Sequence, residues 1–187
     1  MRIISGTCRG RKLTPLKGMD IRPTSDRIRE TLFNILGPRV KNAQVLDLFA
    51  GTGALGLEAL SRGAAHAVFL DRSDIACQTI RQNIDRCGFL EQTTVIRQDL
   101  FSLRLPAAIV SRQFDLIFLD PPYDNGYVIQ ILEQKNPAAL LSENGMIVAE
   151  HAADEILPSS LNGLDIFRQK KYSRTTISFL TRTQDIA

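Results

Sequence analysis

A glycine-rich turn between a predicted strand and a predicted helix is the feature that most restricts the fold of this chain. Residues 44–49 form an apolar run typical of a buried strand, and residues 54–62 carry apolar side chains at helical spacing. Between them, Gly51, Gly53 and Gly56 match the pattern G-x-G-x-x-G. Glycines at these positions let the backbone approach a ligand closely. The turn therefore predicts a βα unit of an open sheet that binds a ligand at the carboxyl edge of its strands.

The same alternation of strand-like and helix-like segments continues along the chain to about residue 150. Further strands are predicted at 66–71, 94–97, 114–119 and 146–150, helices at 73–87 and 127–134, and a helical turn from 137. Ser73 is expected to cap its helix and Gly88 to end it. The pattern predicts a parallel sheet with helices on both faces. Two extended runs, 165–171 and 175–181, predict a hairpin that adds an antiparallel strand.

The first 40 residues differ from the rest and are rich in positive charge. A small β-hairpin is expected over residues 2–16, and a helix with Ile28 and Leu32 on its apolar face is expected to begin near residues 24–26. Residues 1–30 hold eight basic and three acidic residues (8 − 3 = +5), whereas the whole chain carries only +3. A basic arm of this kind favours a polyanion partner, although it is also compatible with a merely soluble N-terminus. The candidate contacts are Arg9, Arg11, Lys12, Arg22 and Arg27.

Composition limits the class of protein. The chain has 187 residues, of which 44% are hydrophobic, as expected of one globular protein with a full core. No apolar run approaches the length of a membrane span, and the first residues do not form a signal peptide. Its three cysteines include no C-x-x-C pair, so neither a zinc site nor a disulfide framework is predicted. A reduced, cytoplasmic protein is expected.

Two acidic residues beside the glycine turn indicate what it binds. Asp71 ends the next predicted strand, 20 residues after Gly51, where an acid can accept hydrogen bonds from a ribose diol. Taken alone, this pattern fits a nicotinamide or flavin dinucleotide. Asp47, however, lies in the strand before the turn, where its carboxylate would repel a pyrophosphate. It suits S-adenosylmethionine, which carries a cationic amine and a sulfonium and no phosphate; alternatively, Asp47 only caps amides of the turn itself.

The remaining predicted cofactor contacts follow the same strands. Asp99 comes after the third strand, where it can accept a hydrogen bond from an adenine amine or lie in a surface loop. With Asp99, the residues Ala50, Arg72 and Leu100 complete the predicted cofactor site.

The tetrapeptide Asp120-Pro121-Pro122-Tyr123 ends the predicted strand 114–119 in an unusual way. Proline cannot donate to a sheet ladder, so the ladder stops here. The turn presents a carboxylate, carbonyl acceptors and a flat ring. These groups suit a planar amino group, because the acceptors take its N–H bonds while the ring stacks on its plane. An ordinary turn that covers the edge of the core is the alternative interpretation.

The two motifs together match a known class of enzyme. Residues 47–53, Asp-Leu-Phe-Ala-Gly-Thr-Gly, resemble the first motif of class I S-adenosylmethionine-dependent methyltransferases, and residues 120–123 resemble the motif of those that methylate amino groups. Further segments are similar to the bacterial 16S rRNA guanine-N2 methyltransferases of the RsmD type: 2–6, 9–13, 22–30 and 55–63. The resemblance covers nearly the whole chain and weakens after about residue 126. Asp71 stands where many relatives carry glutamate, and either acid can hold the diol.

The resemblance implies a Rossmann-like α/β fold with a seven-stranded, mostly parallel sheet, a C-terminal antiparallel hairpin and a small N-terminal extension. It also implies S-adenosylmethionine as cofactor and methyl transfer to N2 of a guanine in 16S rRNA, in the small ribosomal subunit or its assembly intermediate. Asp120, Pro121, Pro122 and Tyr123 would be catalytic. Residues 1–40 would bind RNA, and residues 41–187 would form the catalytic domain of a metal-free monomer.

Two alternatives stay open. The first is a DNA adenine or cytosine amino-methyltransferase, which normally needs a target-recognition insert that this chain has no spare segment to supply. The second is a non-catalytic RNA-binding module on a methyltransferase fold.

Overall fold

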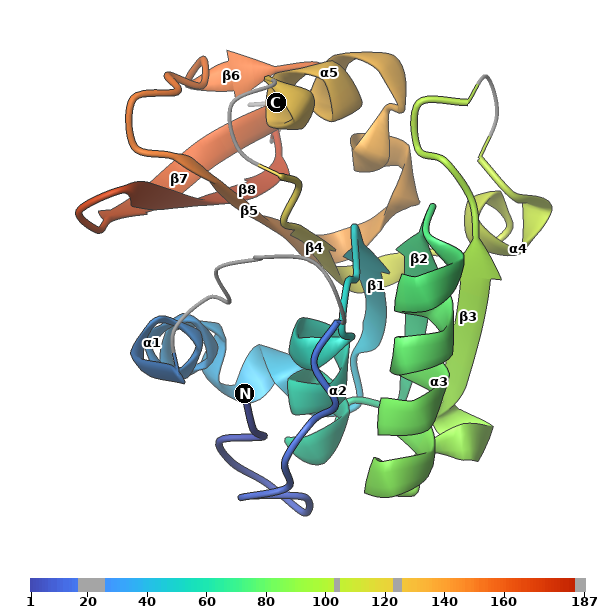
Figure 1. Ribbon diagram of the computed structural model, residues 1–187. Helices are drawn as coiled ribbons and strands as arrows, with labels where there is room; N and C mark the ends of the chain where they lie inside the picture. Colours follow the sequence, from blue (N-terminus) through green and yellow to red (C-terminus); the bar gives the residue numbers. More distant parts are fainter. Residues whose placement is uncertain (17–25, 103–104, 123–125, 184–187) are drawn as a thin grey trace. The chain divides into compact units, whose positions relative to one another are not determined.

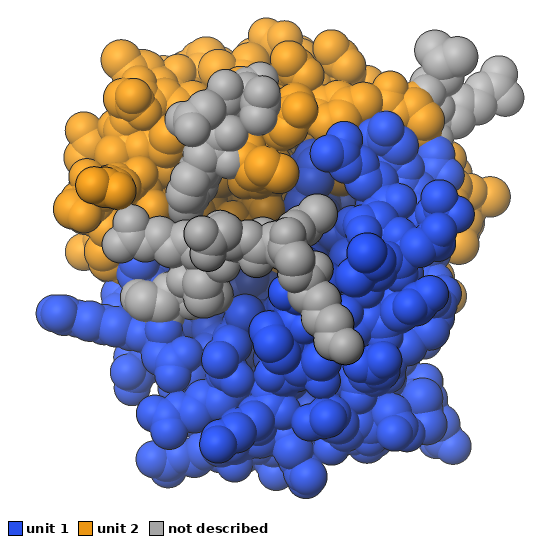
Figure 2. All heavy atoms as spheres, viewed as in Figure 1, with its two compact units in different colours: residues 1–99 blue, residues 100–187 orange. Residues whose placement is uncertain are grey.

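The computed structural model describes residues 1–16, 26–102, 105–122 and 126–183 (Figure 1). The chain divides into two compact units, residues 1–99 and 100–187, which are coloured separately in Figure 2. Both units combine strands with helices, as the alternating sequence pattern predicts. The expected functional division after residue 40 does not coincide with this boundary and stays a prediction.

The first unit is built on three parallel strands in the order β3-β2-β1. They are β1 (Gln44–Leu48), β2 (His66–Asp71) and β3 (Thr93–Arg97). The central strand is buried along most of its length, since Val68, Phe69 and Leu70 are each at most 1% exposed. Each strand lies close to its predicted range, and the parallel pairing confirms the expected sheet.

Two helices connect these strands, α2 (Ala54–Ser61) and α3 (Asp74–Cys87). Ser73 caps α3, because its hydroxyl accepts a hydrogen bond from the Ala76 amide at 3.3 Å. Gly88 ends α3 in the left-handed conformation, at φ +75°. Both helix ends therefore form where the sequence predicts them.

The N-terminal segment, residues 1–16, differs from the expected hairpin. It contains a single antiparallel bridge, Arg2 to Lys12, and no pair of regular strands. The segment is instead held by its own packing and by α2 and α3, with Ile3 and Leu13 buried. Alternation between polar and apolar residues is weak here, so regular strands would bury little apolar surface on either face.

The helix α1 (Asp26–Leu36) follows, and its expected start at residues 24–25 lies outside the described residues. Its buried side chains are Arg29, Leu32, Phe33 and Leu36. Arg29 is only 1% exposed and donates a hydrogen bond to the Arg2 carbonyl at 2.7 Å. It also forms a salt bridge with Asp26, so this member of the basic arm is structural. A short 3-10 turn, η1 (Gly37–Val40), leads into β1.

The second unit contains five strands in the order β4-β5-β8-β7-β6. They are β4 (Phe114–Leu119), β5 (Leu141–Ala152), β6 (Ser160–Leu161), β7 (Leu164–Lys171) and β8 (Thr175–Arg182). The pair β4–β5 is parallel, whereas β8 runs antiparallel to both β5 and β7. The predicted C-terminal hairpin is thus confirmed. The described residues contain eight strands rather than seven, because the two-residue strand β6 pairs with β7 across the turn Asn162-Gly163. Both turn residues have positive φ, at +50° and +75°, and Asn-Gly is a hairpin signal that the expectation of seven strands left out.

The helices of the second unit are α4 (Ala107–Val110) and α5 (Tyr127–Gln134), followed by the 3-10 turn η3 (Pro137–Leu140). The helix α5 coincides with its predicted range and buries Val128, Ile131 and Leu132. A third short turn, η2 (Leu90–Gln92), lies in the first unit before β3. Across the described ranges, every helix is too short or too polar to cross a bilayer.

Candidate cofactor and catalytic site

The turn after β1 is conformationally unusual at three nearby positions. Phe49, Gly51 and Gly53 all have positive φ, at +59°, +56° and +77°. The other described non-glycine residues with positive φ are asparagines, which tolerate this region better than an aromatic residue does. Holding a non-glycine residue such as Phe49 at positive φ lowers the stability of the folded protein by about 1–3 kcal/mol. Such a conformation persists only where the surrounding structure enforces it. Such strain is typical of functional sites.

The third glycine of the motif allows α2 to pack closely on the sheet. A Cβ added at Gly56 would lie 2.4 Å from the Phe69 ring and 3.2 Å from Oδ2 of Asp47. A side chain is therefore excluded both by the helix–strand contact and by the carboxylate beneath it. Glycine is therefore required at position 56 by the packing of α2 on β2, independently of a bound ligand.

Asp47 lies within β1 and is 2% exposed. Its Oδ2 accepts a hydrogen bond from the Gly56 amide at 2.9 Å, so the carboxylate does contact an amide at the start of α2. Burial raises the pKa of Asp47 to about 8; the Gly56 hydrogen bond opposes this shift, and the nearby Asp71 carboxylate adds to it. Within the described ranges no salt bridge reaches Asp47. A cation placed beside Asp47 would stabilise its ionised form, which burial and the Asp71 carboxylate disfavour.

Asp71 connects the glycine turn to the start of α3. Its Oδ2 accepts a hydrogen bond from the Gly51 amide, and its Oδ1 accepts one from the Ser73 amide, both at 2.9 Å. Each carboxylate oxygen has a second lone pair, so these bonds leave acceptor capacity for a hydroxyl donor. The carboxylate is half-buried and fixed in place by two backbone amides. It is well suited to hold a diol.

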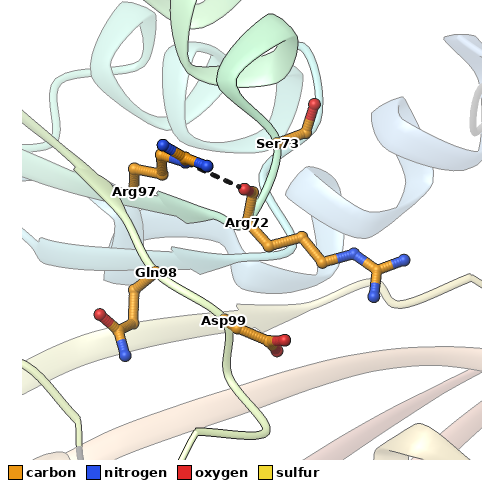
Figure 3. A pocket seen from close by; sticks show the side chains of 5 residues that line it. All are labelled: Arg72, Ser73, Arg97, Gln98 and Asp99. Carbon is orange, nitrogen blue, oxygen red and sulfur yellow. Dashed lines mark hydrogen bonds between the residues drawn. The ribbon is translucent and has the colours of Figure 1, made fainter.

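A surface pocket of about 610 Å³ lies at the carboxyl end of β3. It is lined by Arg72, Ser73, Arg97, Gln98 and Asp99 (Figure 3). Figure 3 shows Arg97 turned back toward the Arg72 carbonyl, to which its Nε donates at 3.4 Å. The structure therefore brings the predicted residues Arg72 and Asp99 to one pocket. Ser73, Arg97 and Gln98 were not predicted to line it, although all three follow the ends of adjacent parallel strands.

The other predicted cofactor residues are more enclosed. Ala50 is 8% exposed and its amide donates to the Leu70 carbonyl at 3.0 Å. Leu100 is 2% exposed and begins the second unit. Their roles in cofactor binding remain predictions.

The predicted catalytic turn follows β4 in the second unit. The strand ends at Leu119, as two consecutive prolines require. Asp120 is half-buried, Pro121 is buried and Pro122 is exposed. Tyr123 lies outside the described residues. The turn is thus located at the carboxyl end of a parallel strand, which is where the sequence places it.

The predicted RNA contacts in the first unit are exposed. The side chains of Arg9, Arg11 and Lys12 lie at the surface of the N-terminal segment, and Arg27 is exposed on α1. Among the residues that the structure describes, none of these four forms a salt bridge. Arg22 lies outside the described residues. The four described side chains are therefore accessible to a polyanion.

Two buried polar residues of α2 anchor the N-terminal segment, and neither is among the predicted site residues. Glu58 is fully buried, and its carboxylate accepts hydrogen bonds from the Ile4 amide at 2.7 Å and the Ser5 amide at 3.0 Å. Ser61 donates its hydroxyl to the Ser5 carbonyl at 2.6 Å and accepts from the Cys8 amide at 2.9 Å. Polar residues in a helix that is otherwise apolar were the available signal. The basic segment is thereby fixed to the unit that carries the glycine turn.

These features define a class of protein. A parallel β-α unit with a glycine turn, a buried acid before it and an amide-anchored acid at the end of the next strand is the arrangement of a class I methyltransferase fold. Comparison with solved structures gives the same class. The structure matches the Escherichia coli protein yhhF with a TM-score of 0.82 and 31% identity, covering 99% of both chains. It matches the Haemophilus influenzae methylase HI0767 with a TM-score of 0.78 and 31% identity, covering 98% of both chains.

The family follows from sequence comparison. The family model described as "Conserved hypothetical protein 95" matches residues 1–181. "Ribosomal RNA small subunit methyltransferase D" of Haemophilus influenzae is 39% identical over 160 residues, which are 84% of this chain and 81% of the relative. The protein of the same name from Escherichia coli K12 is 35% identical over 172 residues, or 91% and 84% of the two chains. The chain belongs to this family, the RsmD family of methyltransferases.

Proposed function

We propose that the protein transfers a methyl group from S-adenosylmethionine to the exocyclic N2 of a guanine in 16S rRNA of the small ribosomal subunit. The observation that carries the proposal is the pair of acids around the glycine turn. A fully enclosed Asp47 and an amide-anchored Asp71 suit a ligand that carries a positive charge and a ribose diol. A dinucleotide fits less well, because its pyrophosphate brings no cation to the buried Asp47 carboxyl and would oppose the ionisation of that group further.

Each acid has a distinct part in holding the cofactor. Asp47 would take the cationic methionyl group, and Asp71 would accept hydrogen bonds from the ribose hydroxyls. Asp99, at the pocket beside β3, would face the adenine amine. When bound, S-adenosylmethionine supplies an electrophilic methyl group on a sulfonium centre.

Asp120 and the Pro121 carbonyl would hold the target amino group. The lone pair of this nitrogen is delocalised into the guanine ring, which makes it a poor nucleophile. Two acceptors on its N–H bonds favour a more tetrahedral nitrogen whose lone pair is free to attack. Positive charge develops on the nitrogen during the attack, and a preorganised carboxylate stabilises it. Asp120, or water beside it, then takes the proton from the methylated product.

The RNA must present the guanine outside its helix. A paired or stacked base cannot reach such a site, so it has to be splayed or flipped out. The exposed cations of the N-terminal segment would hold phosphates around it. Two relatives, each named a ribosomal RNA small subunit methyltransferase, support this substrate over DNA.

The test is product mapping. Purified protein is incubated with labelled S-adenosylmethionine and either small subunits, large subunits, naked 16S rRNA or duplex DNA. The proposal predicts label in 16S rRNA, recovered after nuclease digestion as N2-methylguanosine at one position. Label only in DNA, or a methylated base other than guanine, would contradict it.

A further inference from the structure

The strand β7, which lies between β8 and the two-residue β6, combines positive charge with an exposed aromatic ring. Along Leu164–Lys171, residues 167–171 are all exposed. Phe167 is 52% exposed, and the other large hydrophobic residues exposed in the described ranges are aliphatic. We propose that the β7–β8 hairpin is a second RNA-binding surface, on which Phe167 stacks with an unpaired base while Arg168 and Lys170 hold the adjoining phosphates. This inference rests on the proposed function, since it assumes an RNA substrate.

A bulge in β7 brings these three side chains together. The register between β7 and β8 shifts between Ile166 and Arg168, which leaves Phe167 as the extra residue. Arg168 is paired with Phe179, and two residues later Lys170 is paired with Ile177, so both cations lie on the same face of the hairpin. The ring of Phe167 lies 6.2 Å from that of Phe179, which places it on this face as well. In a regular strand, Phe167 and Arg168 would point to opposite faces.

The hairpin carries a strong excess of positive charge. Residues 164–182 contain five basic side chains and one acidic side chain, for a net charge of +4. Arg182 is occupied, because its guanidinium donates to the carbonyls of Ala138 and Leu141. The remaining four are Arg168, Lys170, Lys171 and Arg174, none of which has a salt bridge within the described ranges. These charges are therefore available to a partner.

Protection of a sheet edge explains part of this pattern but not all of it. The strand β6 pairs with Leu164 and Asp165, and the Ile166 amide donates to the Ser159 carbonyl at 2.9 Å, so within the described ranges the outer edge of β7 is open from Phe167 onward (Figure 1). Lysines on an open edge oppose unwanted strand pairing. An exposed phenylalanine on the same edge has the opposite effect, because it adds apolar surface where pairing is to be avoided. Stacking on a nucleic-acid base accounts for an exposed ring at Phe167. Arg168 and Lys170 can then bind the phosphates on either side of that base.

The experiment measures binding without methyl transfer. The probes are a fluorescein-labelled oligouridylate of about 20 nucleotides, long enough for a site of this kind, full-length 16S rRNA and intact small subunits. The variants are Phe167→Ala, Phe167→Tyr and the double reversal Arg168→Glu with Lys170→Glu. Reversal to glutamate keeps the edge charged, so protection against strand pairing is retained. Matched controls are Ile156→Ala, an exposed aliphatic truncation, and Lys41→Glu with Arg112→Glu, an equal change of net charge at other exposed positions.

The expected results are specific to the hairpin. Phe167→Ala should weaken binding by about 5- to 100-fold, and Phe167→Tyr should bind as the wild type does, because base stacking needs only a ring. The double reversal should reduce the slope of log affinity against log salt by about 1.4, the contribution of two phosphates on single-stranded RNA. Both control variants should bind within about twofold of the wild type. Thermal unfolding is measured for every variant, so a loss of fold is separated from a loss of binding.

Three results would overturn the proposal. The first is that Phe167→Ala and the double reversal both bind RNA with the affinity of the wild type. The second is that the charge control Lys41→Glu, Arg112→Glu loses as much RNA affinity as the double reversal does. The third is that the hairpin variants bind naked RNA normally but bind small subunits less tightly. The last result would assign the surface to a ribosomal protein. A wild-type protein that binds RNA through this hairpin but methylates none would contradict the proposed function and leave this inference intact.

Discussion

The side-chain amide of Asn83 in α3 donates a hydrogen bond to the backbone carbonyl of Thr52 in the glycine turn, at 3.0 Å. The same nitrogen donates to the Thr14 carbonyl at 3.1 Å, and the side-chain oxygen accepts from the Thr14 amide at 2.7 Å. Asn83 is fully buried. One side chain thus joins the N-terminal segment, the glycine turn and α3. We infer that the N-terminal segment and the glycine turn are mechanically connected.

Replacing Asn83 with alanine should loosen both segments at once. The change removes three hydrogen bonds and leaves backbone groups of Thr14 and Thr52 without a partner, which costs about 1–3 kcal/mol for each group that stays buried. We expect urea unfolding to show a loss of about 2–4 kcal/mol and calorimetry to show weaker binding of S-adenosylmethionine. The exposed neighbour Gln82→Ala should change stability by less than about 0.5 kcal/mol. Equal stability of the two variants would mean that Asn83 does not connect these segments.

Two glycines of the N-terminal segment provide a matched pair. Gly6 and Gly10 have nearly the same φ, +83° and +82°, but a Cβ on Gly6 would lie 1.7 Å from the Ser61 carbonyl oxygen, whereas a Cβ on Gly10 meets nothing within 4 Å. Gly10→Ala should lower the free energy of unfolding by about 1–2 kcal/mol, which is the strain of an alanine at positive φ. Gly6→Ala should lower it by at least about 2 kcal/mol more, because the added Cβ forces the N-terminal segment away from α2.

The distinguishing measurement for this pair is hydrogen exchange of the amides of Ile4, Ser5 and Thr7. These amides should lose protection in Gly6→Ala and keep it in Gly10→Ala, since their acceptors belong to α2. Similar protection in both variants would show that the segment is not held by this close contact.

The raised pKa of Asp47 predicts a pH dependence of both stability and cofactor binding. The pKa rises from an ordinary 3.8 to about 8 in the folded protein, chiefly through burial. Between these values the folded protein holds a proton that the unfolded chain has lost, so the stability of the free protein should fall as pH rises through this window. A cationic ligand prefers the ionised carboxylate, so its affinity should rise with pH up to about 8. Asp47→Asn should flatten both profiles; an unchanged pH profile of binding would exclude Asp47 as the cation partner.

The exposed cations of the N-terminal segment should govern RNA affinity. Charge reversal of Arg9, Arg11 and Lys12 removes up to three phosphate contacts, which should lower the salt slope of 16S rRNA binding by about 2–3. Gel-shift titration at several salt concentrations measures this slope. The Lys41→Glu, Arg112→Glu protein serves as the charge control. A salt slope equal to that of the wild type would show that Arg9, Arg11 and Lys12 do not contact RNA phosphates.

Much of the fold could be predicted because its signals are local. Three segments, 66–71, 114–119 and 127–134, coincide with β2, β4 and α5, since each is an apolar or amphipathic run bounded by clear breaks. The capping of α3 by Ser73 and its end at Gly88 follow from the chemistry of single residues. The acid after β2 and the pocket residues Arg72 and Asp99 could be placed because parallel strands end at one edge.

The features that the sequence does not reveal depend on contacts between distant segments. The anchoring of Ile4 and Ser5 by Glu58 joins positions more than 50 residues apart. A buried Arg29 is unexpected on a helix face, and its Nη2 donates there to the Arg2 carbonyl and to Asp26, which offsets part of the cost of burying the charge. Its buried Nε and Nη1 have no hydrogen-bond partner among the described residues. The strand β6 is different, because it pairs with β7 across the turn Asn162-Gly163, a local hairpin signal next to a strand of only two residues. Local propensity contains no information on the contacts of Glu58 with Ile4 and Ser5 or of Arg29 with the Arg2 carbonyl.

The proposed catalytic role of Asp120 is measured most directly with Asp120→Asn. This change keeps the size of the side chain and removes the charge that is proposed to stabilise the methylated amino group. We expect a single-turnover rate of methyl transfer to 16S rRNA that is lower by about 10²–10³, with the dissociation constant for S-adenosylmethionine within about twofold of the wild type. A variant that transfers the methyl group at the wild-type rate while it binds the cofactor normally would contradict the proposed catalytic role of Asp120.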